Sequence, residues 1–248
     1  MDAYVAKSYQ EIFDIVSEIK HSHFDNKEIW FRGQGSSEYV LKPSLLRIPI
    51  GIDKEKELFS EFKRLSTGIG IGYTNEWSAL VDMQHYGIPT RLLDWTYNMG
   101  VALYFAVSTS VLHSPMSLYI MDPMELNKLS NKKGIPVLPN DTMGLSYIKN
   151  YVDREPFPAR YPIAAKCDSI NQRIKAQSGM FTIHGDEENA SDIIATILDK
   201  KSAIYKIDIS SEAIYSLNDY FCFSGIHDYT IFPDIQGIAS HLRGILGL

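Results

Sequence analysis

Residues 84 to 96 read Gln84-His85-Tyr86-Gly87-Ile88-Pro89-Thr90-Arg91-Leu92-Leu93-Asp94-Trp95-Thr96. The segment packs polar and aromatic side chains against a Gly-x-Pro turn. Gly87 and Pro89 stop the helical pattern before them and fix the direction of the chain, which lets the polar groups on both sides converge. The segment therefore predicts a functional site built around a turn.

Five side chains of this segment carry groups suited to ligand binding. His85 can titrate near neutral pH, and Tyr86 and Trp95 have rings on which a nucleobase or a nicotinamide can stack. Asp94 can orient an arginine or His85, and Thr96 can bond a ribose hydroxyl. A lone histidine is more often structural and a lone tryptophan more often belongs to the core. The density of such residues, and not any one of them, favours a site.

A second block precedes the first and reads Ile29-Trp30-Phe31-Arg32-Gly33-Gln34-Gly35. Its three large apolar residues in a row predict a buried strand, and the glycines then end it and let the backbone approach a ligand. The planar guanidinium of Arg32 fits a phosphate or carboxylate in a bidentate way. Two interpretations stay open: an anion-binding arginine, or a structural salt bridge with Asp94.

The remaining pattern predicts an α+β fold in one domain over residues 1–248. Apolar spacings of three and four predict helices at 9–19 and 54–65, and helices are also expected at 77–86, 193–198 and 235–246. Residues 101–108 are apolar without alternation and fit a buried helix or a strand; we favour a helix, because they follow the segment 84–96, which needs a backing element. Apolar or alternating runs predict strands at 29–33, 117–121, 173–177, 180–183 and 203–208. Because strands and helices do not alternate regularly, we expect a central, mostly antiparallel or mixed sheet with flanking helices. Residues 122–162 have a weak apolar pattern and predict an insertion or a mobile lid.

The composition narrows the class of protein. The 248 residues carry a net charge of −6, which argues against a broad grip on duplex DNA but leaves a local basic groove open. Cys167 and Cys222 lack metal-ligand spacing, so no metal site is expected. The first residues have neither a basic region nor a long apolar run, and no stretch approaches the ~20 apolar residues of a membrane span. We therefore expect a cytoplasmic protein with no membrane partner.

Several blocks together resemble a known family. They are Phe31-Arg32-Gly33, residues 84–96, Ala102-Leu103-Tyr104-Phe105-Ala106, residues 171–181 and Thr230-Ile231-Phe232-Pro233-Asp234. From about Ile29 to the C-terminal helix the chain resembles the FRG-domain family, which takes its name from the first block.

A more distant likeness is to ADP-ribosyltransferases of the Arg-Ser-Glu type. Arg32 looks like their NAD-contacting arginine at the end of a first strand. Residues 92–96 followed by 101–106 look like their Ser-Thr-Ser strand and the next helix, and residues 177–183 look like the strand after their catalytic glutamates. This likeness implies a split central sheet and NAD as the substrate.

The likeness also implies roles for individual residues. An arginine holds the phosphates, aromatic and hydroxyl groups hold the nicotinamide side, and a carboxylate stabilises the charge that develops as nicotinamide leaves. No Glu-x-Glu precedes Gly179, so Asp94 and Asp228 are the candidate carboxylates, and Asp228 is favoured by its place beside the last block. Gln177 can bind a ligand or an acceptor but cannot serve as the acid. The implied catalytic residues are Arg32, Asp94, Asp228 and Gln177; the implied NAD-binding residues are Arg32, Gly33, Gln34, His85, Tyr86, Thr90, Trp95 and Thr96.

Three functions remain open at this point. The first is an NAD-using ADP-ribosyltransferase or NAD glycohydrolase, of the toxin or phage-defence kind, with a macromolecular acceptor or water. The second is a module that binds a nucleotide or NAD-like small molecule without chemistry, which the missing Glu-x-Glu favours. The third is a nucleic-acid-associated interaction protein, for which the candidate contacts are Lys132, Lys133, Lys149, Arg154 and Arg160.

Overall fold

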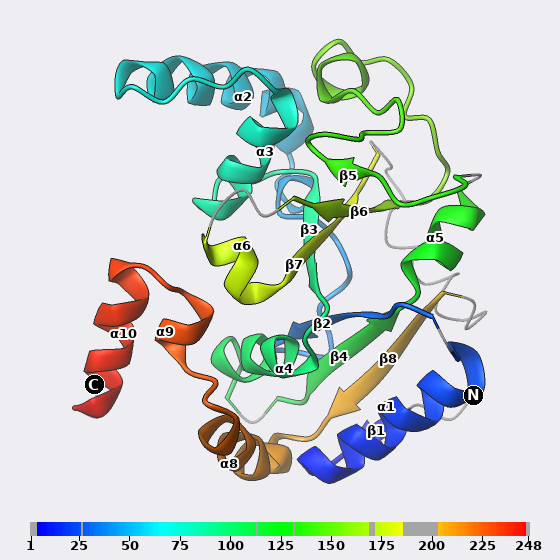
Figure 1. Ribbon diagram of the computed structural model, residues 1–248, viewed down its shortest axis with the longest axis vertical. Helices are drawn as coiled ribbons and strands as arrows, with labels where there is room; N and C mark the ends of the chain where they lie inside the picture. The colour runs from blue at the N-terminus through cyan, green and yellow to red at the C-terminus, as the bar shows by residue number, and fades with distance from the viewer. Residues whose placement is uncertain are drawn as a thin grey trace.

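The computed structural model describes residues 4–25, 27–112, 114–130, 132–168, 172–185 and 203–246 (Figure 1). Within these ranges the chain forms one eight-stranded sheet in the order β1-β8-β4-β2-β3-β7-β6-β5. The outer pairs β1–β8 and β5–β6 are parallel, and all other neighbours are antiparallel. A mixed sheet with flanking helices confirms the expected fold class.

The elements of the described ranges are labelled as in Figure 1. The strands are β1 (Tyr4–Ala6), β2 (Trp30–Gln34), β3 (Leu92–Thr96), β4 (Met116–Met121), β5 (Val137–Leu138), β6 (Ile163–Cys167), β7 (Gly179–Ile183) and β8 (Ile204–Ile209). The α-helices are α1 (Tyr9–His23), α2 (Gly51–Gly68), α3 (Glu76–His85), α4 (Met99–Ser108), α5 (Pro123–Leu129), α6 (Gln172–Gln177), α8 (Ile214–Ser224), α9 (Asp228–Ile231) and α10 (Ile235–Ile245). The short helical turns are η1 (Leu45–Arg47), η2 (Ile148–Val152) and η3 (Ser211–Ala213).

The sheet divides into two halves between β2 and β3. All five residues of β2 pair with β4, and all five residues of β3 pair with β7. Between β2 and β3, by contrast, the register holds one pair, Phe31 opposite Thr96. The two central strands therefore diverge. Apart from this one pair, the facing edges of β2 and β3 are not paired with each other.

Three apolar clusters hold the sheet and helices together. Helices α1, α4 and α8 pack on the half that contains β1, β8, β4 and β2, with Ile12 and Leu103 fully buried. Helices α2 and α3 pack on the other half around Trp77. The third cluster covers the opposite face of the two central strands, around Trp30 and Trp95. In Figure 1, α1 and α8 lie at the bottom of the molecule, α4 lies beside β2 and β4, and α2 lies at the top with α3 beside the upper part of β3.

The glycines of the second block have a packing role. A Cβ atom on Gly33 would lie 1.8 Å from the Ala102 carbonyl oxygen of α4, and one on Gly35 would lie 1.9 Å from the Thr109 carbonyl oxygen. Helix α4 therefore approaches β2 so closely that no side chain fits. These glycines therefore admit a helix, and both also line the cavity, so their expected contact with a ligand stays a prediction.

A buried ion pair connects α2 to the start of β3. Arg91 Nε and Nη2 donate to the Glu55 carboxylate at 2.6–2.9 Å, and the Tyr147 hydroxyl donates to the same carboxylate at 2.9 Å. Glu55 and Arg91 are both almost fully buried. Each charge is acceptable inside the protein because the other one compensates it. The pair fixes the strand that carries Asp94.

Most predicted elements are found close to their expected bounds, and one is of the wrong type. Residues 173–177 were expected as a strand but lie in α6, whose Ile174 is buried against the core. A helix of six residues is too short to show a helical period in its sequence. The strand that follows, β7, begins at Gly179, after Ser178 with a φ of 48°. The helix expected at 193–198 lies outside the described residues.

Residues 122–162 form a structural layer. They supply α5 and β5 and bury Leu138, Tyr147 and Tyr151 in the core. The described residues of this segment contribute side chains to the core, and its prediction as an insertion or a mobile lid stays a prediction. The apolar pattern is weak because its buried residues lie in elements too short to show a period, such as β5 and η2.

No helix in the described part of the chain is long and apolar enough to cross a membrane.

Candidate functional site

A cavity of about 400 Å³ lies between the two central strands of the sheet. This volume falls within the range of small-molecule sites. The lining comes from β2, the loop after it, η1, α3, β3, α4, α6, β7 and the residue after α9. The polar lining residues are Arg32, Gln34, Tyr39, Arg47, Gln84, His85, Asp94, Thr96, Thr109, Arg173 and Gln177. The apolar ones are Phe31, Val81, Trp95, Val101, Ala102, Phe105, Ile174, Phe181 and Phe232, with Gly33, Gly35 and Gly179.

Arg32 spans the split in the sheet. Its Nη1 donates to the Asp94 carbonyl oxygen at 2.7 Å and lies 3.9 Å from the Asp94 carboxylate. The side chain is 17% exposed, and its buried Nε has no partner among the described residues. Burial lowers the pKa of Arg32, Asp94 opposes this, and the nearby Arg47 adds to it. The guanidinium thus donates a hydrogen bond to the backbone carbonyl of Asp94. This carbonyl lies on the edge of β3 that faces β2.

Asp94 presents its carboxylate to the cavity. Of the described residues that line the cavity, it alone carries a carboxylate. Its side chain is 57% exposed, and Oδ2 accepts a hydrogen bond from Gln84 Nε2 at 2.8 Å. The loss of bulk hydration between the cavity walls raises the pKa of Asp94, while Arg32 and the Gln84 hydrogen bond both counteract the rise. The carboxylate is therefore held by one hydrogen bond from Gln84, with the Arg32 guanidinium 3.9 Å away, in a partly dehydrated setting.

The turn after α3 brings Gln84 beside Asp94. Gly87 has a φ of +78°, a conformation that glycine adopts without cost, and the Ile88 N–H bonds back to the Met83 carbonyl at 2.9 Å. The chain then reverses into β3. The predicted role of the Gly-x-Pro turn, to make polar groups converge, agrees with this geometry.

Thr90 sets the orientation of the Gln84 amide. Its Oγ1 accepts from the Leu92 N–H at 3.0 Å, so the hydroxyl hydrogen is free to donate to Gln84 Oε1 at 2.5 Å. The amide oxygen then faces Thr90 and the NH₂ group faces Asp94. Thr90 is buried and does not line the cavity, so it acts on the site through Gln84 and not as the ligand contact expected from sequence.

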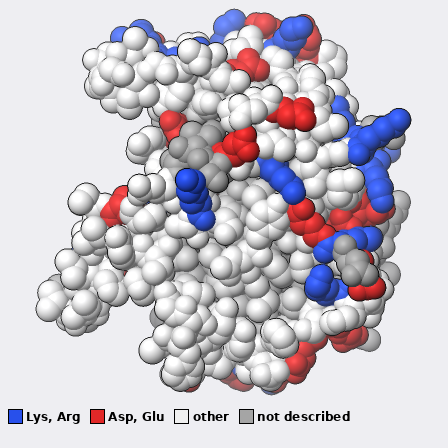
Figure 2. Space-filling view, viewed as in Figure 1, with Lys and Arg blue, Asp and Glu red and all other residues white. Residues whose placement is uncertain are grey.

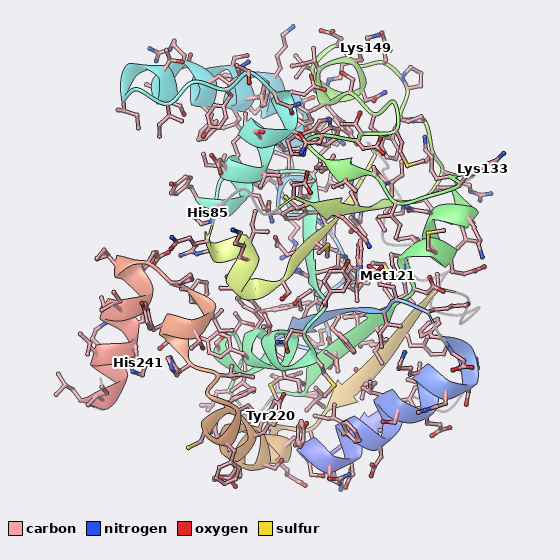
Figure 3. The ribbon with its side chains drawn as sticks, in the orientation of Figure 1. His85, Met121, Lys133, Lys149, Tyr220 and His241 are labelled. Carbon is pink, nitrogen blue, oxygen red and sulfur yellow. The ribbon has the colours of Figure 1, made fainter. Side chains whose placement is uncertain are left out.

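Arg173 and aromatic rings form another part of the wall. The Arg173 guanidinium lies over the Phe232 ring at 4.7 Å, and its Nη2 donates to Asp234 at 2.9 Å. Its Nη1 donates to the His85 carbonyl oxygen at 3.3 Å. Burial and then Arg173 lower the pKa of His85, so its imidazole is neutral at neutral pH. Figure 3 shows His85 at the end of α3, next to α6.

Four further predicted residues line the cavity, and their polar groups are largely engaged within the protein. Trp95 is buried, and its Nε1 donates to Thr182 Oγ1 at 3.1 Å. Thr96 Oγ1 donates to the Gln177 carbonyl oxygen at 2.6 Å and accepts from the Asn98 N–H at 3.0 Å. These two residues shape the cavity wall, and the Thr96 hydroxyl is not free for a ribose.

Gln34 and Gln177 also lie at this wall. Gln34 is 4% exposed and its Oε1 has no partner among the described residues. Gln177 Nε2 donates to the Ile231 carbonyl oxygen at 3.3 Å. The Gln34 side-chain oxygen therefore accepts no hydrogen bond from any described residue. The Gln177 side chain, in contrast, connects α6 to α9 by its hydrogen bond.

Besides Thr90, two predicted residues lie outside the cavity lining. Asp228 stands in the first turn of α9 and accepts a hydrogen bond from the Tyr104 hydroxyl. Tyr86 is 69% exposed and its ring contacts His85 edge-on. The structure thus corrects the preference for Asp228 as the carboxylate, because of the two candidate acids Asp94 is the one at the cavity.

Sequence reasoning missed Arg47, Arg173, Phe105 and Phe232 as lining residues. Arg47 ends the short helical turn η1, in a segment that was expected as a loop or short turn, and Arg173 was assigned to a strand. Phe105 and Phe232 belong to two of the blocks that resemble the FRG-domain family. Their presence in these blocks was the one sign in the sequence that they could lie at the site.

The comparisons with known proteins were informative for one part of the chain. Residues 27–114 match the family model of the FRG domain, which supports the FRG-domain family. This segment contains β2, α3, β3 and α4, and thus the strands on both sides of the split. No curated protein and no solved structure matches the chain significantly.

Proposed function

We propose, starting from an FRG domain at residues 27–114, that the cavity binds NAD and that the chain cleaves the bond between nicotinamide and ribose. The observation that carries the proposal is the Asp94 carboxylate, which opens into a cavity beside the Arg32 guanidinium and is held by Gln84. An ADP-ribosyltransferase or an NAD glycohydrolase needs such a combination of anion-binding and acidic groups in one cleft.

The lining suits the two chemical parts of a dinucleotide. Three arginines, Arg32, Arg47 and Arg173, provide cationic groups for phosphates. Phenylalanine rings at positions 105, 181 and 232 offer apolar faces against which a flat base or a nicotinamide can pack. A ligand that joins phosphates to aromatic rings uses both kinds of surface.

Asp94 has the chemistry for the bond-breaking step. When the N-glycosidic bond breaks, its electron pair leaves with nicotinamide and positive charge develops on the ribose carbon. A carboxylate that stabilises this charge, directly or through the ribose 2′-hydroxyl, lowers the barrier. Water or an acceptor hydroxyl then adds to the carbon and releases its proton to solvent. Asp94 must be ionised for this role, so activity should fall as the pH drops below its pKa.

Nicotinamide release from NAD tests the proposal. We expect the purified protein to release nicotinamide, and we expect Asp94→Asn to reduce the rate by roughly 100-fold, the typical loss of one charge-stabilising group. Asp228→Asn is the matched control, because it makes the same chemical change outside the cavity lining. Equal rates in the wild-type protein and Asp94→Asn would remove Asp94 from the reaction.

A binding module without chemistry is the second candidate. It is favoured by the cavity lining, in which Asp94 is the one carboxylate among the described residues. NAD binding to the wild-type protein without nicotinamide release would support this function instead.

If the chain cleaves NAD, a role as a toxin or in phage defence is the biological function that we propose for it. Expression of the wild-type chain in cells would then lower cellular NAD, and Asp94→Asn would not. Unchanged NAD in cells with active protein would argue against this role.

The nucleic-acid alternative has less support. On the face in Figure 2, the Lys and Arg side chains are scattered among acidic ones and form no continuous groove. Lys133 and Lys149 lie well away from His85 in Figure 3. The basic residues of segment 122–162 are therefore not part of the cavity lining.

A further inference from the structure

The three arginines of the cavity differ in how their charges are balanced. Arg173 forms an ion pair with Asp234 at 2.9 Å, and Arg32 lies 3.9 Å from the Asp94 carboxylate. Arg47 is exposed and forms no ion pair with any residue that the structure describes. Arg47 is therefore the cavity guanidinium whose charge the described protein leaves uncompensated.

The loop that carries Arg47 is well anchored. Leu45 and Leu46 are buried, the Leu45 N–H donates to the Thr90 carbonyl oxygen at 3.2 Å, and the Thr90 N–H donates to Ser44 Oγ at 3.3 Å. Arg47 Nε donates to the Lys42 carbonyl oxygen at 2.8 Å. One edge of the guanidinium is thus fixed by its own loop, while no described residue accepts a hydrogen bond from its Nη groups. This is a preorganised donor pair.

Arg32 has a different task. Its Nη1 is used by the Asp94 carbonyl oxygen, and that bond joins β2 and β3 where the sheet splits. Arg47 is close enough to Arg32 for their charges to repel each other. An anion between the two guanidiniums would relieve this repulsion.

We propose that Arg47 is the main anion-binding side chain of the cavity and takes a phosphoryl group of the ligand, while Arg32 is a positioning residue that holds β3 and Asp94 against β2. The proposal deepens the proposed function and shares its ligand class, but it concerns binding and not bond cleavage. A phosphoryl group is preferred to a single carboxylate because its several oxygens can accept from both Nη groups of Arg47 and still lie near the charge of Arg32.

Calorimetric titration with two probes tests this assignment. ADP-ribose carries a diphosphate, whereas adenosine has the same base and no phosphate. We expect Arg47→Gln to weaken ADP-ribose binding roughly tenfold to 100-fold, as the loss of charged hydrogen bonds does. Adenosine affinity should stay unchanged. Arg47→Lys, which keeps the charge and loses the planar fork, should give an intermediate loss.

The matched control is Arg64→Gln. Arg64 lies on α2, is exposed, pairs with Glu61 and does not line the cavity, so the variant changes net charge by the same amount. Its ADP-ribose affinity should equal that of the wild-type protein. Thermal unfolding of Arg47→Gln should be unaltered, since the side chain is exposed.

Two results would overturn the assignment. One is an Arg47→Gln variant that binds ADP-ribose as tightly as the wild-type protein; the other is a wild-type protein that binds no ADP-ribose. Failure of the proposed function has a different signature: ADP-ribose binding that depends on Arg47, together with no release of nicotinamide from NAD.

Discussion

At the scale of single residues, the site depends on groups that fix one another. Thr90 orients Gln84, Gln84 holds the Asp94 carboxylate, and Arg32 holds the Asp94 carbonyl oxygen. The sequence placed Arg32 and Asp94 in one site because an arginine at the end of a buried strand needs a partner and Asp94 lies in the polar and aromatic segment 84–96. The sequence did not reveal that Thr90 orients Gln84 toward Asp94. These two hydrogen bonds depend on how the turn after α3 folds back, and residue type alone does not show this.

The Gln84 hydrogen bond should influence the pH dependence of nicotinamide release. This bond lowers the pKa of Asp94 and so partly offsets the rise that burial causes. Gln84→Ala removes the bond, so the pKa of Asp94 rises further and the acidic limb of the activity profile moves to higher pH. The measurement is the rate of release between pH 4 and pH 8.

The control for this change is Gln10→Ala. Gln10 donates to Asp14 on the exposed surface of α1 at 2.9 Å, so the variant removes the same kind of bond far along the chain from the site. Its pH profile should match the wild type. An acidic limb in Gln84→Ala that stays in place, or moves to lower pH, would speak against Asp94 as the ionising group.

At the scale of elements, the contact between β2 and α4 positions Arg32. The close approach of the two backbones requires Gly33, and the helix in turn supplies Phe105 to the cavity wall. The sequence predicted the strand and the helix separately from their apolar patterns. It attributed the glycine to a ligand, since a close approach by a ligand and one by a helix leave the same sequence signal.

Gly33→Ala should strongly destabilise the protein. The new Cβ would lie 1.8 Å from the Ala102 carbonyl oxygen, so α4 must move away from β2. We expect a loss of about 3 kcal/mol in the free energy of unfolding, at the upper end for overpacking. Urea denaturation gives this value directly.

Gly68→Ala provides the comparison for this prediction. A Cβ at Gly68, in the last turn of α2, meets nothing within 4 Å. The variant should be as stable as the wild type or more stable by up to about 1 kcal/mol, because alanine favours the helix. A Gly33→Ala protein with similar stability would mean that β2 and α4 are further apart than in this structure.

At the scale of the whole molecule, the split between β2 and β3 creates the site. The sheet halves are joined at Phe31 and Thr96, which are far apart in the sequence. Periodicity predicts strands but not their neighbours, so composition and apolar pattern indicated a mixed sheet while the split came from a family resemblance alone. The sequence also did not show that residues 172–177 form a helix or that residues 122–162 bury side chains in the core. Elements this short do not show a period in their apolar residues.

The most direct test of the account is hydrogen–deuterium exchange of the Asp94→Asn variant with and without NAD, since that variant should bind NAD and consume it much more slowly than the wild-type protein. The account predicts that NAD slows exchange in residues 30–34, 84–96 and 172–179, which flank the cavity, and leaves the β8–α8 region unchanged. Slower exchange confined to residues outside these segments, or no change at saturating NAD, would contradict the claim that the split in the sheet is the NAD site.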